Sequence, residues 1–173
     1  MLDSTLDDEH VPSRLKLGLW VAILAFAADQ LHKFWMINIF HIADRGRVTV
    51  ASWFDLLITI NPGVSYGLFA QDRGFGQYLL AAFALAVSLL LVIWMSRTHY
   101  RLVAVSLGLI LGGALGNALD RFIRGGVADF FSLHYNGFYF YIFNVADVAI
   151  TFGVIGLVLD ALGWFKPRAA DAG

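Results

Sequence analysis

The amino-acid sequence predicts an all-α membrane protein in which four transmembrane helices carry a small extramembrane β-sheet. Hydrophobic residues make up 59% of the 173 residues and charged residues 14%, whereas an ordinary soluble domain has roughly 45–50% and about 25%. A domain of this length leaves a large share of its surface exposed, so the excess of apolar side chains indicates a lipid environment. Four long apolar segments are the second observation that predicts this fold.

Each apolar segment is close to the roughly 20 residues that a membrane-spanning helix needs. The second and third segments have no charged side chain, whereas Asp29 and Lys33 enter the first, and Asp147 and Asp160 enter the fourth. We expect a transmembrane helix in each segment. The segments cover residues 17–37, 74–96, 102–119 and about 146–165.

The two longer connections have a different composition. Residues 38–73 contain VTVASWFDLLITI, a run rich in β-branched and aromatic residues that is typical of strands. Turn residues follow it, so we expect a small sheet that lies on the helix bundle. Residues 130–144, FFSLHYNGFYFYIFN, are dense in aromatic rings, which favour the membrane–water interface. This second connection predicts an interfacial strand or a short helix.

We expect one domain over residues 1–173, with polar tails at residues 1–13 and 167–173. The net charge of -1 gives no basic excess for binding nucleic acid, and the absence of cysteine excludes disulfides and a thiol nucleophile. Four crossings place both termini on one side of the membrane. Basic residues near the helix ends favour cytoplasmic termini only slightly.

The charged residues inside the apolar segments are the first candidates for function, because ionisable groups at membrane depth are costly. Asp29 and Lys33 are four residues apart, which places them on one helical face where they can pair. A structural ion pair that attaches the first helix to the bundle and a direct role in a site are equally good interpretations.

The pattern N-x-x-D occurs twice, as Asn117 with Asp120 and as Asn144 with Asp147. One copy ends a predicted helix and the other begins one, and both ends lie on the same side of the membrane. A single copy is most simply a helix cap. Together with Asp129, the two copies predict carboxylates that converge at one interface.

Converging carboxylates allow three kinds of chemistry. They could bind a hard metal ion in an enzyme that acts on lipid head groups, or couple protons or ions in a small membrane transporter that uses Asp29, Lys33, Asp120 and Asp147. They could also form an aspartic-protease dyad, in which one carboxylate activates water and the other, protonated, donates to the scissile carbonyl. No nucleophile elbow, H-E-x-x-H pattern or P-loop supports another class of catalyst.

Four motifs make the chain resemble the bacterial lipoprotein signal peptidases, the signal peptidase II family. The resemblance covers the chain from about Asp29 to Asp160, and the motifs stand in the family's order; one departure is His32, where the family commonly has threonine. The motifs are DQLHK at residues 29–33, NPGVSYGLF at 61–69, GGALGNALDRFIRGGVADF at 112–130 and FNVADVAITFG at 143–153.

The resemblance implies four transmembrane helices with a β-cradle and a short interfacial helix in the bacterial cytoplasmic (inner) membrane. The termini would be cytoplasmic and the active site would lie near the outer, periplasmic surface. The implied activity is that of an aspartic endopeptidase without metal or other cofactor. It would remove the signal peptide from prolipoproteins modified with diacylglycerol, cutting just before the lipidated cysteine. The partners would be this substrate and membrane lipid, and one dyad per chain leads us to expect a monomer.

The resemblance places the catalytic dyad on Asp129 and Asp147. The positive end of a helix dipole favours an ionised Asp147, so we expect Asp147 to act first as the base and Asp129 as the acid. Eight further residues would support the dyad or contact the substrate. They are Asp29, Lys33, Asn61, Gly63, Asn117, Asp120, Arg121 and Asn144.

Overall fold

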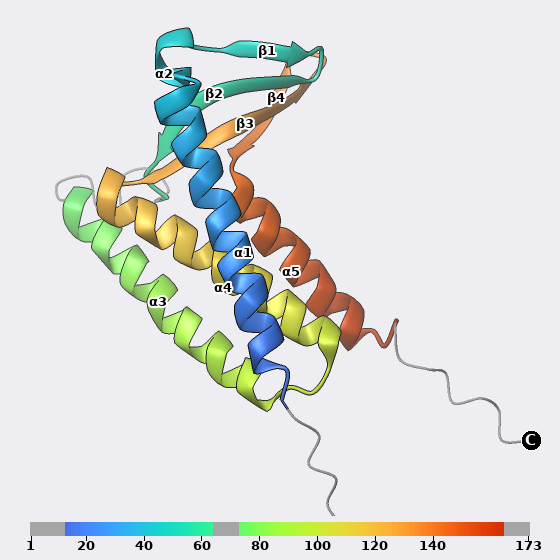
Figure 1. The fold of residues 1–173 in the computed structure, drawn as a ribbon. Coiled ribbons are helices and arrows are strands. Elements are labelled where there is room, and N and C mark those ends of the chain that lie inside the picture. The colour runs from blue at the N-terminus through green and yellow to red at the C-terminus, as the bar shows by residue number, and fades with distance from the viewer. Residues whose placement is uncertain (1–12, 64–72, 165–173) are drawn as a thin grey trace, which may run out of the picture.

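A bundle of long helices carries a four-stranded antiparallel sheet at one end, as the computed structural model shows for residues 13–63 and 73–164 (Figure 1). Apart from Ser13, the predicted polar tails lie outside these ranges. The helices are α1 (Leu15–Phe34), continued by the π-helical turn η1 (Trp35–Ile39), α2 (Ile42–Arg45), α3 (Arg73–Arg97), α4 (Arg101–Arg124) and α5 (Val145–Ala161). The strands are β1 (Val48–Ala51), β2 (Phe54–Asn61), β3 (Val127–Tyr135) and β4 (Phe138–Phe143).

Three helices in the described ranges are long and apolar enough to cross a membrane: Leu15–Ile39, Phe75–Arg97 and Arg101–Arg124. They correspond to the first three predicted spans. The fourth predicted span coincides with α5, whose 17 residues extend about 26 Å at 1.5 Å per residue. A fourth crossing therefore stays a prediction.

Helix α4 is the central helix and packs against α1, α3 and α5. Its small residues allow close approach, as in other helix pairs within membranes. A Cβ added at Gly113 would lie 2.5 Å from the carbonyl oxygen of Ala146 and 2.8 Å from Ile150 of α5. The first turn of α5 is thus held directly against α4, one residue before Asp147.

The end of α4 differs from the prediction, which placed it at Leu119. The helix continues to Arg124, and Gly125 ends it in the left-handed conformation with φ of 68°. Charges at Asp120 and Arg124 do not end the helix, because they pair with one another on consecutive turns. Gly125 thus begins the turn from α4 into β3.

The sheet has the strand order β1-β2-β3-β4, with every neighbouring pair antiparallel. The strand predicted within residues 38–73 is confirmed by β1 and β2. The aromatic segment after it forms most of a β-hairpin, in which Asn136 and Gly137 supply the two positive φ angles of the turn. Asp129, for which the sequence predicted no strand, lies on β3 opposite Thr59. Both faces of this end of the strand are covered, so the Asp129 side chain is 1% exposed.

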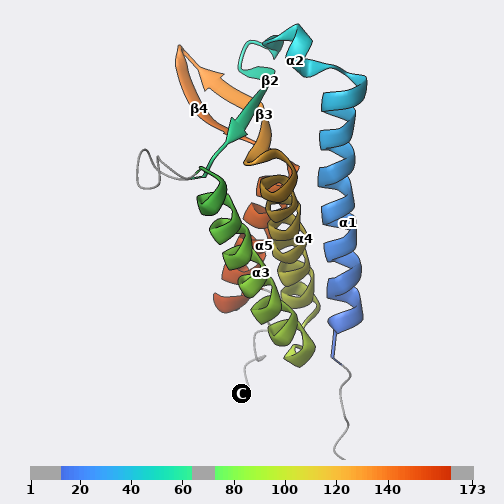
Figure 2. The ribbon, with the colours of Figure 1, turned by 90° about the vertical axis from the view of Figure 1, so that its left-hand side faces the viewer.

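Apolar side chains cover the outside of the helices. This pattern is the reverse of a soluble bundle, and it agrees with the lipid environment that the composition predicts. The start of α1 and the end of α5 both lie at the end of the bundle away from the sheet (Figure 2). The short helix α2 lies beside the sheet, and its depth relative to a membrane stays a prediction. Exposed examples on the helices are Trp20, Leu24, Phe83, Leu90 and Phe152.

The contact between α4 and α5 gives a test of this packing. Gly113→Ala should lower the free energy of unfolding by about 1–3 kcal/mol, because the added methyl group overpacks the contact with Ala146. Thermal unfolding in detergent micelles measures this loss. Ala82→Val, on the exposed face of α3, is the matched control and should leave stability unchanged. Equal losses in both variants would contradict the packing described.

Candidate active site

A fully buried lysine forms the base of the candidate site. Lys33 Nζ lies 2.8 Å from Asp29 Oδ2 and 2.7 Å from Asp120 Oδ2, and all three side chains have 0% exposure. Burying a charge is expensive unless it is paired and hydrogen-bonded. The ion pair expected on α1 therefore exists, but it includes a second carboxylate from α4.

Both carboxylates of this cluster are fully occupied. Asp29 Oδ1 accepts a hydrogen bond from the backbone nitrogen of Ala146 at 3.0 Å, which fixes the start of α5. Asp120 Oδ1 pairs with Arg124 at 2.5 Å, and its Oδ2 accepts from the backbone nitrogen of Ala128 at 3.1 Å. Asp29 and Asp120 thus connect α1 with α5 and with the entry to β3. Each of them is therefore bound to at least one buried or half-buried cation as well as to a backbone nitrogen.

Two asparagines extend from the lysine toward the other two aspartates. Asn117 Oδ1 accepts from Lys33 Nζ at 3.3 Å and from Asn144 Nδ2 at 3.2 Å. Because the ammonium group can only donate, it fixes which end of the Asn117 amide faces it. Asn117 Nδ2 therefore faces Asp147 Oδ1, to which it donates at 3.0 Å.

Asn144 contacts both predicted dyad carboxylates. Asn144 is the N-cap of α5 and forms a capping box with Asp147. Asn144 Oδ1 accepts from the backbone nitrogen of Asp147 at 3.0 Å. The backbone nitrogen of Asn144 donates to Asp147 Oδ2 at 3.2 Å. Asn144 Nδ2 donates to Asp129 Oδ1 at 2.6 Å. The cap interpretation of N-x-x-D is confirmed for this copy, and the same asparagine also contacts Asp129.

The second oxygen of Asp129 is held from the sheet. Asn61 Nδ2, at the end of β2, donates to Asp129 Oδ2 at 3.0 Å. Burial, together with the nearby Asp147, raises the pKa of Asp129 to about 6 against the lowering effect of the hydrogen bonds from Asn61 and Asn144. Asp129 therefore holds a proton far more readily than an ordinary carboxyl group.

A tight turn at Gly63 fixes the orientation of the Asn61 amide. The Gly63 backbone nitrogen donates to Asn61 Oδ1 at 2.8 Å, so Asn61 Nδ2 must face the other way. Gly63 has φ of 68°, and a Cβ there would lie 2.9 Å from Arg121 Nη2. Arg121 in turn donates from Nη1 to the backbone oxygen of Asn117 at 3.1 Å. The glycine thus allows the arginine to lie close to the turn.

One network of hydrogen bonds and ion pairs connects all ten predicted site residues. Three further participants were not predicted. The first is Gln30, whose Nε2 donates to Asp29 at 3.0 Å and to the Gly116 carbonyl at 3.2 Å. The second is Arg124, which pairs with Asp120. The third is Tyr141, whose hydroxyl accepts from Asn61 Nδ2. The spacing of Arg124 four residues after Asp120 could have identified it. Nothing in the aromatic run distinguishes Tyr141 from its neighbours.

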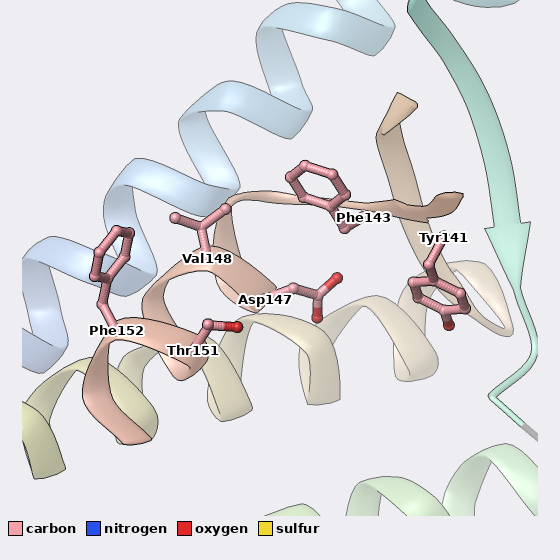
Figure 3. A pocket seen from close by; sticks show the side chains of 6 residues that line it. All are labelled: Tyr141, Phe143, Asp147, Val148, Thr151 and Phe152. Carbon is pink, nitrogen blue, oxygen red and sulfur yellow. The ribbon is translucent and has the colours of Figure 1, made fainter. Parts of the chain in front are cut away.

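An apolar groove of about 370 Å³ lies beside Asp147. Residues of β4 and of the first two turns of α5 line it, and the Asp147 carboxylate is turned toward the side on which Tyr141 lies (Figure 3). Such a groove can hold an apolar segment next to a carboxylate. The lining residues are Tyr141, Phe143, Asp147, Val148, Thr151 and Phe152.

Comparison with known proteins identifies similar chains over most of this length. A family model described as signal peptidase (SPase) II matches residues 21–163. A lipoprotein signal peptidase of Beijerinckia indica is 48% identical over 145 residues, which cover 84% of this chain and 87% of the relative. The lipoprotein signal peptidase of Nitrobacter hamburgensis is 44% identical over 162 residues, covering 91% and 98% of the two chains.

The fold has solved counterparts. A structure described as a bacterial membrane enzyme, determined at 2.3 Å resolution, superposes with a TM-score of 0.73 at 23% identity and covers 94% of this chain and 98% of its own. A second, at 1.9 Å resolution, gives a TM-score of 0.72 at 24% identity and covers 91% and 97% of the two chains. At such identities the likeness concerns the fold alone.

The buried lysine gives a test of the network. Lys33→Met should lower the free energy of unfolding by about 3–5 kcal/mol, because two buried carboxylates lose their shared cation. The control is Arg47→Met, which removes a half-exposed partner of Asp55 and should lower it by less than about 1 kcal/mol. Thermal unfolding in detergent micelles compares the two variants. If Lys33→Met lost no more unfolding free energy than Arg47→Met, Lys33 would not be the shared partner that stabilises Asp29 and Asp120.

Proposed function

Because the chain belongs to the signal peptidase II family, we propose that it is an aspartic endopeptidase acting on prolipoproteins modified with diacylglycerol. It removes the signal peptide by cutting just before the lipidated cysteine. The family match over residues 21–163 and relatives named lipoprotein signal peptidase support the substrate. The hydrogen-bond network around Asp129 and Asp147 supports the aspartic type.

The observation that carries the mechanism is the single residue, Asn144, that contacts both carboxyl groups. It brings Asp129 of β3 and Asp147 of α5 to one point at the end of the bundle. In contrast, Asp29 and Asp120 are neutralised by direct ion pairs with Lys33, whereas the described partners of Asp129 and Asp147 are amide and backbone N–H groups. This difference favours Asp129 and Asp147 as the dyad and leaves Asp120 a supporting role.

Each carboxyl group has a distinct task in the proposed reaction. Ionised Asp147 takes a proton from water as the water oxygen attacks the scissile carbonyl carbon, and Asp129 gives its proton to the carbonyl oxygen, which yields a gem-diol. Asp147 then passes its proton to the amide nitrogen while Asp129 regains a proton from the diol. The C–N bond breaks, leaving the carboxyl end of the signal peptide and the free amine of the lipidated cysteine.

The surroundings of the two carboxyl groups support this assignment. The raised pKa of Asp129, about 6, favours it as the protonated member. Asp147 lies in the first turn of α5, where the positive end of the helix dipole favours a carboxylate. Asn117 Nδ2 also donates a hydrogen bond to Asp147 Oδ1 and holds this carboxyl group in position.

The membrane arrangement follows from the same proposal. In this proposal α5, with its apolar surface, crosses the membrane as a fourth span. The two ends of the described bundle then lie at opposite membrane surfaces. We place the sheet and the dyad at the periplasmic surface of the cytoplasmic membrane, with both termini in the cytoplasm. The lipid-modified substrate then reaches the site from the bilayer, and the apolar groove beside Asp147 accepts part of the signal peptide. One domain, acting as a monomer, contains every group that the reaction uses.

Replacing either member of the dyad tests the proposal. Asp129→Asn and Asp147→Asn should each lower the rate of cleavage by about 10²- to 10⁴-fold, because each removes a group that transfers a proton. The measurement is cleavage of a purified diacylglyceryl-modified precursor, with thermal unfolding to show that each variant is folded. Full activity in either folded variant would exclude the dyad.

The acidity of Asp129 gives a second test. The kcat/KM of the wild-type protein should fall as the pH rises through about 6, because Asp129 must be protonated to act as the acid. In Asn61→Ala the fall should move to higher pH, because the lost hydrogen bond stabilises the ionised carboxylate. A wild-type profile that is flat from about pH 5 to 8, or a fall displaced to lower pH in the variant, would contradict the assignment.

A further inference from the structure

Tyr141 is the residue nearest the dyad that neither the sequence patterns nor the proposed mechanism explains. It lies on β4 with a side chain that is 70% exposed, so its ring contributes little to the buried core. Its hydroxyl group nevertheless points into the site and accepts a hydrogen bond from Asn61 Nδ2. An exposed aromatic ring with an ordered hydroxyl beside a carboxyl dyad indicates a contact with something outside the chain.

The direction of this hydrogen bond determines what the hydroxyl group can do. Gly63 donates its backbone N–H to Asn61 Oδ1, so the NH2 end of Asn61 faces Asp129 and Tyr141. Its two hydrogens serve Asp129 Oδ2 and the tyrosine oxygen. A phenol oxygen that accepts a hydrogen bond still has one proton to donate. Within residues 13–63 and 73–164, no group receives that proton.

A shared donor allows Tyr141 and Asp129 to act on one atom. The Tyr141 hydroxyl and Asp129 Oδ2 both accept from Asn61 Nδ2, so the two oxygens are no farther apart than two hydrogen-bond lengths, about 6 Å. One oxygen atom placed between them can therefore receive hydrogen bonds of ordinary length from both. Tyr141 also lines the groove beside Asp147 (Figure 3), and its exposure leaves the side chain within reach of a bound peptide.

We propose that Tyr141 is a catalytic residue whose hydroxyl group donates a hydrogen bond to the scissile carbonyl oxygen, next to the one donated by Asp129. It transfers no proton. It stabilises the negative charge that develops on that oxygen as water attacks, which is the role of a donor in an oxyanion hole. This inference rests on the proposed peptidase function and adds to it a third group in contact with the reacting atoms.

Kinetics of Tyr141→Phe test the inference. The variant should lower kcat on the diacylglyceryl-modified precursor by about 10- to 100-fold, somewhat less than a fully buried oxyanion donor contributes. Its KM and its midpoint of thermal unfolding should stay unchanged, because the exposed ring remains. A lipopeptide inhibitor with a hydroxyethylene group in place of the cleaved bond carries a hydroxyl that mimics the oxygen of the tetrahedral intermediate. This inhibitor should bind Tyr141→Phe more weakly than it binds the wild-type protein, by a factor similar to the fall in kcat/KM.

The matched control is Tyr139→Phe. Tyr139 lies two residues earlier on β4, is also exposed, and contacts His134 and Arg47 rather than the dyad. The Tyr139→Phe variant should keep the kcat and KM of the wild-type protein. Wild-type kcat in Tyr141→Phe, a rise in KM alone, or an equal loss in Tyr139→Phe would overturn the role given to Tyr141 while leaving the peptidase intact. An inactive wild-type protein would instead overturn the proposed function, and this inference with it.

Discussion

The structure depends on one buried cation. Lys33 is completely enclosed, and it touches two carboxylates and one amide oxygen that come from α1 and α4. In an apolar environment such a group is tolerated only when its partners hold fixed positions. Through these partners, the same charge fixes the start of α5 at Ala146 and the entry to β3 at Ala128. These are the two segments that carry Asp147 and Asp129.

The lysine also sets the direction of the hydrogen bonds between itself and the dyad. Since it can only donate, Asn117 must accept from it and donate to Asp147, and Asn144 must then donate to Asn117 and Asp129. A second fixed amide, Asn61, reaches Asp129 from the sheet. In the described part of the chain, Asp129 and Asp147 are thus held by amide and backbone donors, and no cation forms a direct ion pair with either.

Much of this arrangement could be predicted from the sequence. The apolar segments and the i, i+4 spacing of Asp29 and Lys33 follow from local periodicity, and the two N-x-x-D patterns pointed to one end of the bundle. The position of Asp129 on a strand, the extent of α4 to Arg124 and the bridging of the two carboxyls by Asn144 could not, because they depend on pairing between distant segments. Tyr141 was missed for the same reason: only the register of β3 and β4, and the turn at Gly63, distinguish its hydroxyl group from those of neighbouring tyrosines.

The central claim is that these carboxyl groups cleave a lipid-modified precursor with no help from a metal ion. The most direct measurement is incubation of the purified protein with a diacylglyceryl-modified precursor, with and without a metal chelator, and mass spectrometry of the products. The account predicts one cut immediately before the lipidated cysteine, at the same rate in both conditions. No cleavage, a cut at another bond, or loss of activity with the chelator would contradict it.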